Sequence, residues 1–117
     1  MIALALLALS LHASTPRLLD CAGKPVVRPA SFVIACADAN TELTRTRWTT
    51  WTASTATGTT RFGINFCKPY CAASKLSYFP RARVRLVAPK HGLFTRIVVT
   101  YVLHGKTKTF VGYPRTR

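Results

Sequence analysis

Apolar and polar residues alternate along much of this chain with a period of two, the pattern of β-strands buried on one face. The first such run is Ser31–Ala37, where Phe32 and Ile34 begin an alternating apolar set. The next three residues, Asp38-Ala39-Asn40, favour a turn, because short carboxylate and amide side chains bond their own backbone there. A second strand is expected over Leu43–Ala53, so the pattern predicts a hairpin near the start of the domain.

Both tryptophans lie in this second strand. In a regular strand Trp48 and Trp51 would point to opposite faces, and a bulge near Thr49-Thr50 would bring them together. Trp48 fits the role of a core aromatic packed against a disulfide. Two alternatives stay open for Trp51: it lies in the core, or it is exposed and stacks on a sugar or a base.

The middle of the chain contains one further clear strand. Ser54–Thr59 is rich in small polar residues and is expected to be a loop. Phe62, Ile64 and Phe66 then alternate with polar residues or glycine, which predicts a half-buried strand. A short helical turn is expected only within Ala72–Tyr78.

The last third reads as two hairpins. A strand at Arg81–Leu86 leads through the turn Pro89-Lys90-His91-Gly92 into a long β-branched strand, Leu93–Leu103. His104-Gly105 predicts a two-residue turn into Lys106–Val111, because histidine tolerates positive φ and glycine adopts it freely.

A register follows from these turns. If Ala88 pairs with Leu93, then Arg85 faces Arg96, Arg83 faces Val98 and Arg81 faces Thr100. If Leu103 pairs with Lys106, Thr109 lies beside Thr100 and Val111 beside Val98. This register predicts that one face of the strands carries the arginines.

Six or seven short strands with regular turn signals favour an all-β fold, a two-sheet antiparallel sandwich that is immunoglobulin-like in architecture only. Cys36 followed by Trp48 fits that comparison. However, the cysteine expected late in an immunoglobulin domain is missing, because Cys71 precedes the last three predicted strands.

Charge is the most unusual property of the composition. The 117 residues include 17 Lys and Arg against 3 Asp and Glu, a formal net charge of +14. Such an excess favours polyanions, whether nucleic acid, acidic lipid or an anionic cell envelope. The alternative is a solvated basic surface with no dedicated partner. The 49% of hydrophobic residues provide enough apolar material for one core.

The first residues resemble a secretory signal peptide. An apolar run, too short to span a bilayer as a helix, precedes His12-Ala13-Ser14, where cleavage after Ala13 is expected. No Lys or Arg precedes the run, so a short core helix is the alternative. The predicted organisation is a signal peptide over residues 1–13, a proline-rich lead-in with an edge strand over 14–30, and a β-domain over 31–114.

Four cysteines in an exported chain predict disulfides rather than a metal site, because their spacing lacks the paired C-x2-C type of zinc sites. Four cysteines allow three pairings. We expect Cys21–Cys36 and Cys67–Cys71, the second closing a short loop bent at Pro69. A secreted, extracellular protein without a transmembrane span is the resulting prediction.

Catalytic chemistry has few candidates here. The only carboxylates are Asp20, Asp38 and Glu42, which disfavours a paired-carboxylate hydrolase. His91 and His104 are expected at exposed hairpin tips rather than as general bases. The chain has neither a glycine-rich phosphate loop nor a zinc-ligand set. A non-enzymatic protein with no cofactor and no metal is therefore predicted.

The arginine face is the main candidate binding site. Guanidinium groups bind phosphate or carboxylate bidentately, so Arg81, Arg83, Arg85 and Arg96 are predicted to bind an anionic ligand or surface. The alternative for these four is that they are solvated, with their stems covering apolar surface.

Two other interaction surfaces are alternatives to the arginine face. The Cys67–Cys71 loop, with Tyr70 in it, offers a stiffened surface for a protein partner or inhibitory contact. Nucleic acid is disfavoured by export, and would need an aromatic platform of Phe94, Tyr101 and Tyr113 beside the arginines.

Several short motifs together resemble a group of small exported actinobacterial proteins of unknown function. They are Cys21-Ala22-Gly23-Lys24-Pro25, Ala35-Cys36-Ala37-Asp38-Ala39-Asn40, Trp48 with Trp51, Ala56-Thr57-Gly58, Cys67 with Cys71-Ala72-Ala73, and Tyr78-Phe79-Pro80. The resemblance covers Cys21 to about Tyr101 and departs from the group at Ala39, where glycine would suit the turn, and at Phe66, where an acidic residue is usual. It implies export and supplies no activity, so no functional residue is carried over.

Overall fold

The computed structural model describes residues 14–116, and the predicted signal peptide over residues 1–13 lies outside the described residues. Two short strands, β1 (Leu18–Leu19) and β2 (Pro25–Val26), form a small antiparallel sheet. The main sheet consists of β3 (Phe32–Val33), β4 (Thr41–Trp51), β5 (Ala56–Ile64), β6 (Ser77–Lys90), β7 (Leu93–Leu103) and β8 (Lys106–Gly112). A 3₁₀ turn, η2 (Cys71–Ala73), lies between β5 and β6.

The six strands of the main sheet form an antiparallel meander. Each strand is hydrogen-bonded to its neighbours in sequence, in the order β3-β4-β5-β6-β7-β8. The all-β, antiparallel prediction is therefore confirmed. A two-sheet sandwich of immunoglobulin-like architecture is not confirmed, because the long strands belong to one continuous sheet and the second sheet has only two short strands.

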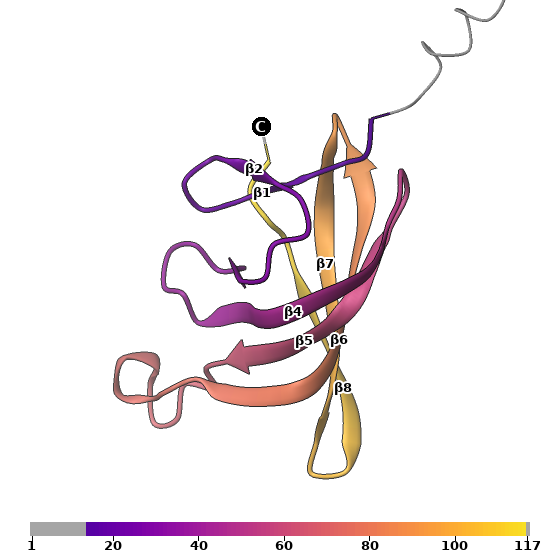
Figure 1. Ribbon diagram of the computed structural model, residues 1–117. Coiled ribbons are helices and arrows are strands. Elements are labelled where there is room, and N and C mark those ends of the chain that lie inside the picture. The colour runs from indigo at the N-terminus through magenta and orange to yellow at the C-terminus, as the bar shows by residue number, and fades with distance from the viewer. Residues whose placement is uncertain (1–13, 117) are drawn as a thin grey trace, which may run out of the picture.

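The meander twists strongly, so that β4 and β5 run across the direction of β7 and β8, and the N-terminal segment lies against one side (Figure 1). We call this side the inner face and the opposite side the outer face. The core lies on the inner face, where Phe62, Leu86, Ile97 and Val99 are fully buried. Leu18 of β1 belongs to the same apolar cluster, so the N-terminal segment closes a core that the sheet alone would leave open.

The two tryptophans attach this N-terminal segment to the sheet. The register between β4 and β5 shifts between Trp48 and Thr50, a bulge that places both indoles on the inner face. Trp48 Nε1 donates to the Pro29 carbonyl at 2.9 Å, and Trp51 Nε1 donates to the Pro16 carbonyl at 2.7 Å. The alternative left open for Trp51 is thereby decided, because its side chain is buried in the core.

The first predicted strand is shorter than expected. Ser31–Ala37 was expected to be extended throughout, but β3 contains only Phe32 and Val33. The chain leaves the ladder because Ala39 donates its backbone N–H to the Ala35 carbonyl and adopts a φ of 53°. The Asp38 side chain accepts the N–H of Asn40 at 3.1 Å, which is the local turn bond that the sequence predicted.

The predicted loop over Ser54–Thr59 is also shorter than expected. Thr52 closes a compact turn, because its hydroxyl accepts the backbone N–H of Thr55 and its own N–H donates to the Thr55 carbonyl. The chain re-enters the sheet at Ala56. The prediction was wrong for Ala56–Thr59, which are strand residues.

The register between β6 and β7 differs from the expected one by two residues. Strand β6 continues to Lys90, which pairs with Leu93, so His91-Gly92 is a two-residue turn. Arg85 consequently lies opposite Val98 and Arg83 opposite Thr100, whereas Arg96 lies opposite Val87. The expected pairing of Arg85 with Arg96 was wrong.

The register of the last hairpin is confirmed. Leu103 pairs with Lys106 across His104-Gly105, and His104 has the expected positive φ of 51°. Further along, Thr100 lies opposite Thr109 and Val98 opposite Val111.

Candidate functional site

The arginines of β6 lie on the outer face because the strand alternates strictly. Ala82, Val84 and Leu86 are buried, and the residues between and before them, Arg81, Arg83 and Arg85, are exposed. Arg96 of β7 is exposed as well, opposite Val87. All four arginines predicted from the sequence therefore reach solvent on one side of the sheet.

The register surrounds two of these arginines with small residues. Arg83 lies between Thr59 of β5 and Thr100 of β7. Arg85 lies between Thr57 of β5 and Val98 of β7. Like charges directly opposite each other on neighbouring strands destabilise a sheet, and neither arginine has such a neighbour.

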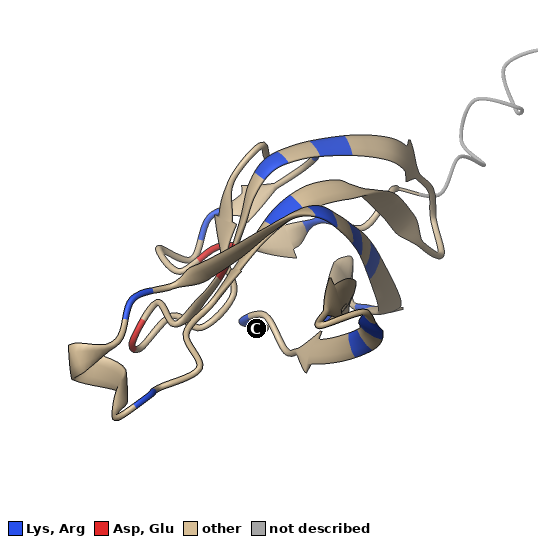
Figure 2. Ribbon diagram, turned by 90° about the horizontal axis from the view of Figure 1, so that it is seen from below, with Lys and Arg blue, Asp and Glu red and all other residues tan. Residues whose placement is uncertain are grey.

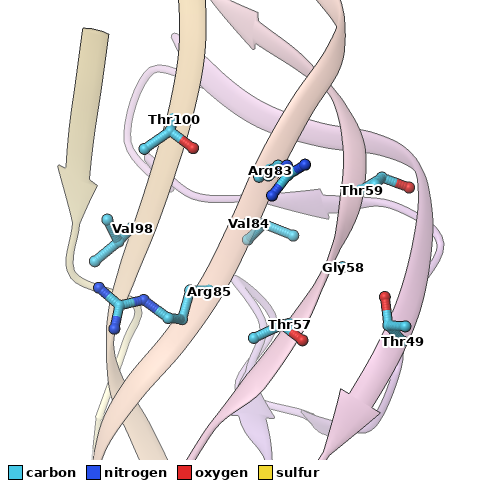
Figure 3. A pocket seen from close by; sticks show the side chains of 9 residues that line it. All are labelled: Thr49, Thr57, Gly58, Thr59, Arg83, Val84, Arg85, Val98 and Thr100. Atoms are coloured by element: carbon cyan, nitrogen blue, oxygen red, sulfur yellow. The ribbon is translucent and has the colours of Figure 1, made fainter. Parts of the chain in front are cut away.

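A groove of about 570 Å³ lies over this part of the outer face (Figure 3). Its lining consists of Thr49, Thr57, Gly58, Thr59, Arg83, Val84, Arg85, Val98 and Thr100. Arg81 and Arg96 are not part of it. The structure thus brings together two of the four predicted arginines and adds four threonines. Sequence reasoning missed Thr49, Thr57 and Thr59, and it placed Thr100 on the arginine face but opposite Arg81.

The signals for the missed threonines were present but misread. Thr57 and Thr59 fell in the segment expected to be a loop, and Thr100 was placed opposite Arg81 by the wrong register. Thr49 enters the groove because it occupies the bulge between Trp48 and Thr50. A prediction that began β5 at Ala56 and used a two-residue β6–β7 turn would have placed Thr57, Thr59 and Thr100 beside Arg83 and Arg85.

The chemistry of the groove suits an oxyanion. A guanidinium group offers a planar fork of N–H donors, and a threonine hydroxyl donates one further hydrogen bond. The lining contains two guanidinium groups, four hydroxyls and no carboxylate. Its volume falls in the range of about 300–1,000 Å³ usual for small-ligand sites.

The three carboxylates of the described chain are engaged elsewhere. Asp20 accepts the backbone N–H groups of Ala22 and Lys24, and Asp38 accepts that of Asn40. Glu42 accepts the Tyr78 hydroxyl at 2.7 Å. Lys and Arg positions outnumber Asp and Glu positions along the chain (Figure 2). No carboxylate in the lining offsets the positive charges of Arg83 and Arg85.

Tyr78 lies on the outer face beside Glu42 and Arg61, outside the groove. Its hydrogen bond to Glu42 is the main cause that raises the pKa of the phenol above the ordinary 10.0, and partial burial and the charge of Glu42 act in the same direction. The Arg61 guanidinium, 3.6 Å from the ring centroid, opposes them. This cluster does not line the groove.

The two histidines of the described chain occupy hairpin turns. His91 and His104 are exposed and lie at opposite ends of β7, a strand of 11 residues that spans about 35 Å. They are therefore too far apart to act together. No group of three or more His, Cys, Asp or Glu side chains that could hold a metal ion occurs in residues 14–116.

Both predicted disulfides form, Cys21–Cys36 and Cys67–Cys71. Asn65 organises the second loop, because its side-chain amide donates to the carbonyls of Cys71 and Ser74 and its carbonyl accepts the N–H of Cys67. Tyr70 in this loop is 62% exposed. The loop projects from the end of the β5–β6 hairpin (Figure 1), which leaves it accessible.

The aromatic platform considered for nucleic acid does not form. Phe94 is fully buried and Tyr101 is 8% exposed, so both belong to the core. Tyr113 alone is accessible, at 70% exposure. Base stacking on a row of these three aromatic rings is therefore excluded.

Comparison with protein-family models, with curated proteins and with solved structures finds no match for this chain. Among residues 14–116, no helix has the length and apolar character needed to cross a membrane. The function must therefore be argued from the groove and the charges around it.

Proposed function

We propose that this protein is a non-enzymatic, exported protein that binds an anionic ligand or an anionic cell-envelope surface through the outer face of its sheet. Arg83 and Arg85 make the direct contacts in the groove, and Arg81 and Arg96 extend the positive surface beside it. The observation that carries the proposal is the register, which places Arg83 between two threonines and Arg85 between Thr57 and Val98, with no carboxylate in the lining.

Export is part of the same proposal. Disulfides persist in oxidising compartments and are rare in the cytosol, and this chain forms two of them. The apolar segment over residues 1–13 and the resemblance to exported actinobacterial proteins point in the same direction. Mass spectrometry of the mature protein tests this part, with an N-terminus at Ser14 expected and an intact leader with free thiols contradicting it.

Binding is tested with dextran sulfate, a soluble polyanion. The double variant Arg83→Glu/Arg85→Glu is compared with Lys106→Glu/Lys108→Glu, which changes the net charge equally on the exposed hairpin strand β8, outside the groove. We expect the arginine variant to lose at least about tenfold more affinity than the lysine variant at about 0.05 M salt, because a desolvated bidentate contact contributes more than a general charge. Equal losses would show that only net charge matters.

Salt provides the second measurement. Exposed charges are screened over about 8–10 Å at physiological ionic strength, so the affinity for dextran sulfate should fall steeply between about 0.05 and 0.5 M salt. Binding that persists unweakened would contradict an electrostatic site. Inorganic sulfate should compete at millimolar concentrations if the groove accepts a single oxyanion.

A second candidate function is a protein-binding or inhibitory contact through the Cys67–Cys71 loop. The disulfide and the Asn65 hydrogen bonds stiffen this loop, and an ordered loop loses little conformational entropy on binding. Its exposed Tyr70 is the type of side chain that dominates interfaces. Tyr70→Ala should abolish capture of a defined partner that Arg83→Glu/Arg85→Glu still binds, and the reverse pattern would reject this function.

A further inference from the structure

Valines and threonines share the outer face of β7 and β8 beside the arginines. Val98 of β7 lines the groove and lies opposite Val111 of β8, which is 42% exposed. Val102 on the same face of β7 is 60% exposed, and Tyr113, just after β8, is 70% exposed. Three of the six large hydrophobic residues most exposed in the described chain therefore belong to β7, β8 or the residue that follows.

Two neighbouring rows of cross-strand partners on the outer face differ in polarity, and a need for positive charge does not explain the difference. In one row Arg83 is followed across β7 and β8 by Thr100 and Thr109. In the next row Arg85 is followed by Val98 and Val111. Val98 is half-buried, whereas Val111 is 42% exposed. Valine and threonine are both β-branched and favour strands, so threonine would serve equally well for folding at the exposed Val111 position.

Arg85 lies between the threonines of β5 and the valines Val98 and Val111 of β7 and β8. In Figure 3 it extends from β6 toward Val98, away from the threonines of β5. Long cationic side chains place their stems on apolar surface and keep the charged head at its edge. A ligand bound by Arg85 therefore meets hydroxyl groups on one side and aliphatic side chains on the other.

We propose that the anion bound at this face is the phosphate headgroup of an anionic phospholipid in a membrane surface. The inference rests on the proposed function and adds the identity of the ligand. The phosphate lies between Arg83 and Arg85 and the threonine hydroxyls, while Val102, Val111 and Tyr113 contact the boundary between headgroups and acyl chains. Basic and aliphatic side chains on one face, with an exposed tyrosine just beyond β8, are the combination that such interfaces favour.

Vesicle sedimentation tests the inference, with phosphatidylcholine vesicles compared with vesicles that also contain phosphatidylglycerol. The key variant is Val102→Thr/Val111→Thr, which replaces the two most exposed valines of β7 and β8 and leaves every residue that lines the groove unchanged. Its control is Val27→Thr, a valine that is also 42% exposed but lies in the N-terminal segment. Thermal unfolding of each variant establishes that the fold is kept.

The wild type should bind phosphatidylglycerol vesicles and retain measurable binding at about 0.5 M salt, because apolar contacts are not screened. The double valine variant should lose about tenfold in vesicle affinity, chiefly the salt-resistant part, while its affinity for dextran sulfate stays unchanged. Val27→Thr should match the wild type in both assays.

The outcomes separate the two proposals. Binding to dextran sulfate together with vesicle binding that is insensitive to the valine changes would overturn the lipid inference and leave the anion site standing. Soluble glycerol phosphate can also be added as a competitor. If it displaces the protein from vesicles as effectively as an excess of competing phosphatidylglycerol vesicles does, the lipid inference is overturned, because the free headgroup would then suffice. Loss of binding to both probes in the wild type would reject the anion site itself.

Discussion

The rings of Trp48 and Trp51 meet edge to face, with centroids 4.9 Å apart and planes at 81°. Residues three apart in a regular strand cannot share a face, and these do so because the bulge inserts Thr49 between them. The same bulge turns Thr49 outward into the groove. One irregularity in β4 therefore joins the core on the inner face to the candidate site on the outer face.

Trp51→Ala should destabilise the fold more than Trp48→Ala. Trp51 is 6% exposed, packs edge-on against Phe94 at 5.6 Å and donates to the Pro16 carbonyl, so its loss leaves both a cavity and an unpaired carbonyl. We expect the free energy of unfolding to fall by about 3–5 kcal/mol for Trp51→Ala and by less for the half-buried Trp48. Urea denaturation measures both, and equal losses would contradict this assignment of the core.

Gly58→Ala should perturb both the fold and the site. A Cβ at this position would collide with the Arg47 carbonyl of β4, which is backbone and cannot move aside without opening the β4–β5 ladder. We expect a loss of about 3 kcal/mol and weaker binding to dextran sulfate, because Gly58 lines the groove.

Gly23→Ala is the matched control for Gly58→Ala. Gly23 has a φ of +81° and no atom within 4 Å of an added Cβ, so only backbone strain of about 1–2 kcal/mol is expected and binding should be unchanged. A Gly58→Ala protein that is as stable as the wild type would contradict the close approach of the two strands.

The two disulfides should contribute unequally to stability. Cys21–Cys36 has a sequence separation of 15 and ties the β1–β2 segment to the start of the main sheet, whereas Cys67–Cys71 has a separation of 4. Loop-closure entropy predicts that Cys21→Ser/Cys36→Ser costs about 3 kcal/mol and Cys67→Ser/Cys71→Ser about 2 kcal/mol.

Urea denaturation of the two double-serine variants measures this difference. Asn65 still holds the short loop after its disulfide is removed, which favours the smaller loss there. A larger loss for the Cys67–Cys71 pair would indicate that this loop supports the sheet rather than projecting from it.

The features that were predicted correctly from the sequence are those that depend on local chemistry. The β-class, both disulfides, the Asp38 turn and the His104-Gly105 turn all follow from alternation, spacing and turn residues. The sandwich was inferred from the number of strands, but strand number does not determine whether successive strands pair with each other or cross to a second sheet.

The groove was not predicted from the sequence. The two-residue difference at the His91-Gly92 turn moved every partner of Arg83 and Arg85, because register is fixed by turn length. The β5 threonines looked like a loop, since alternating small polar residues carry no apolar signal when their strand buries only Ala56 and Gly58 at that end. The pairing of β5 with β6, which the local sequence pattern does not specify, brings these threonines beside the arginines.

The phenol of Tyr78 should titrate above its ordinary pKa of 10.0, and two variants should move that pKa in opposite directions. Its O–H donates to Glu42 at 2.7 Å, a bond that exists only while the phenol is protonated. Glu42→Gln removes the charged acceptor, so the pKa should fall toward 10.0, whereas Arg61→Ala removes the cation that lowers it, so the pKa should rise further.

A pKa that is higher in the folded than in the unfolded chain has a definite consequence for stability. The contribution of this hydrogen bond is fully present below the unfolded value and is lost as the pH rises through the raised pKa of Tyr78. Tyrosinate absorbance near 295 nm, taken as the difference between the wild type and Tyr78→Phe, isolates this residue among the four tyrosines. If Glu42→Gln and Arg61→Ala leave the difference titration unmoved, Tyr78 lies in solvent, free of both neighbours.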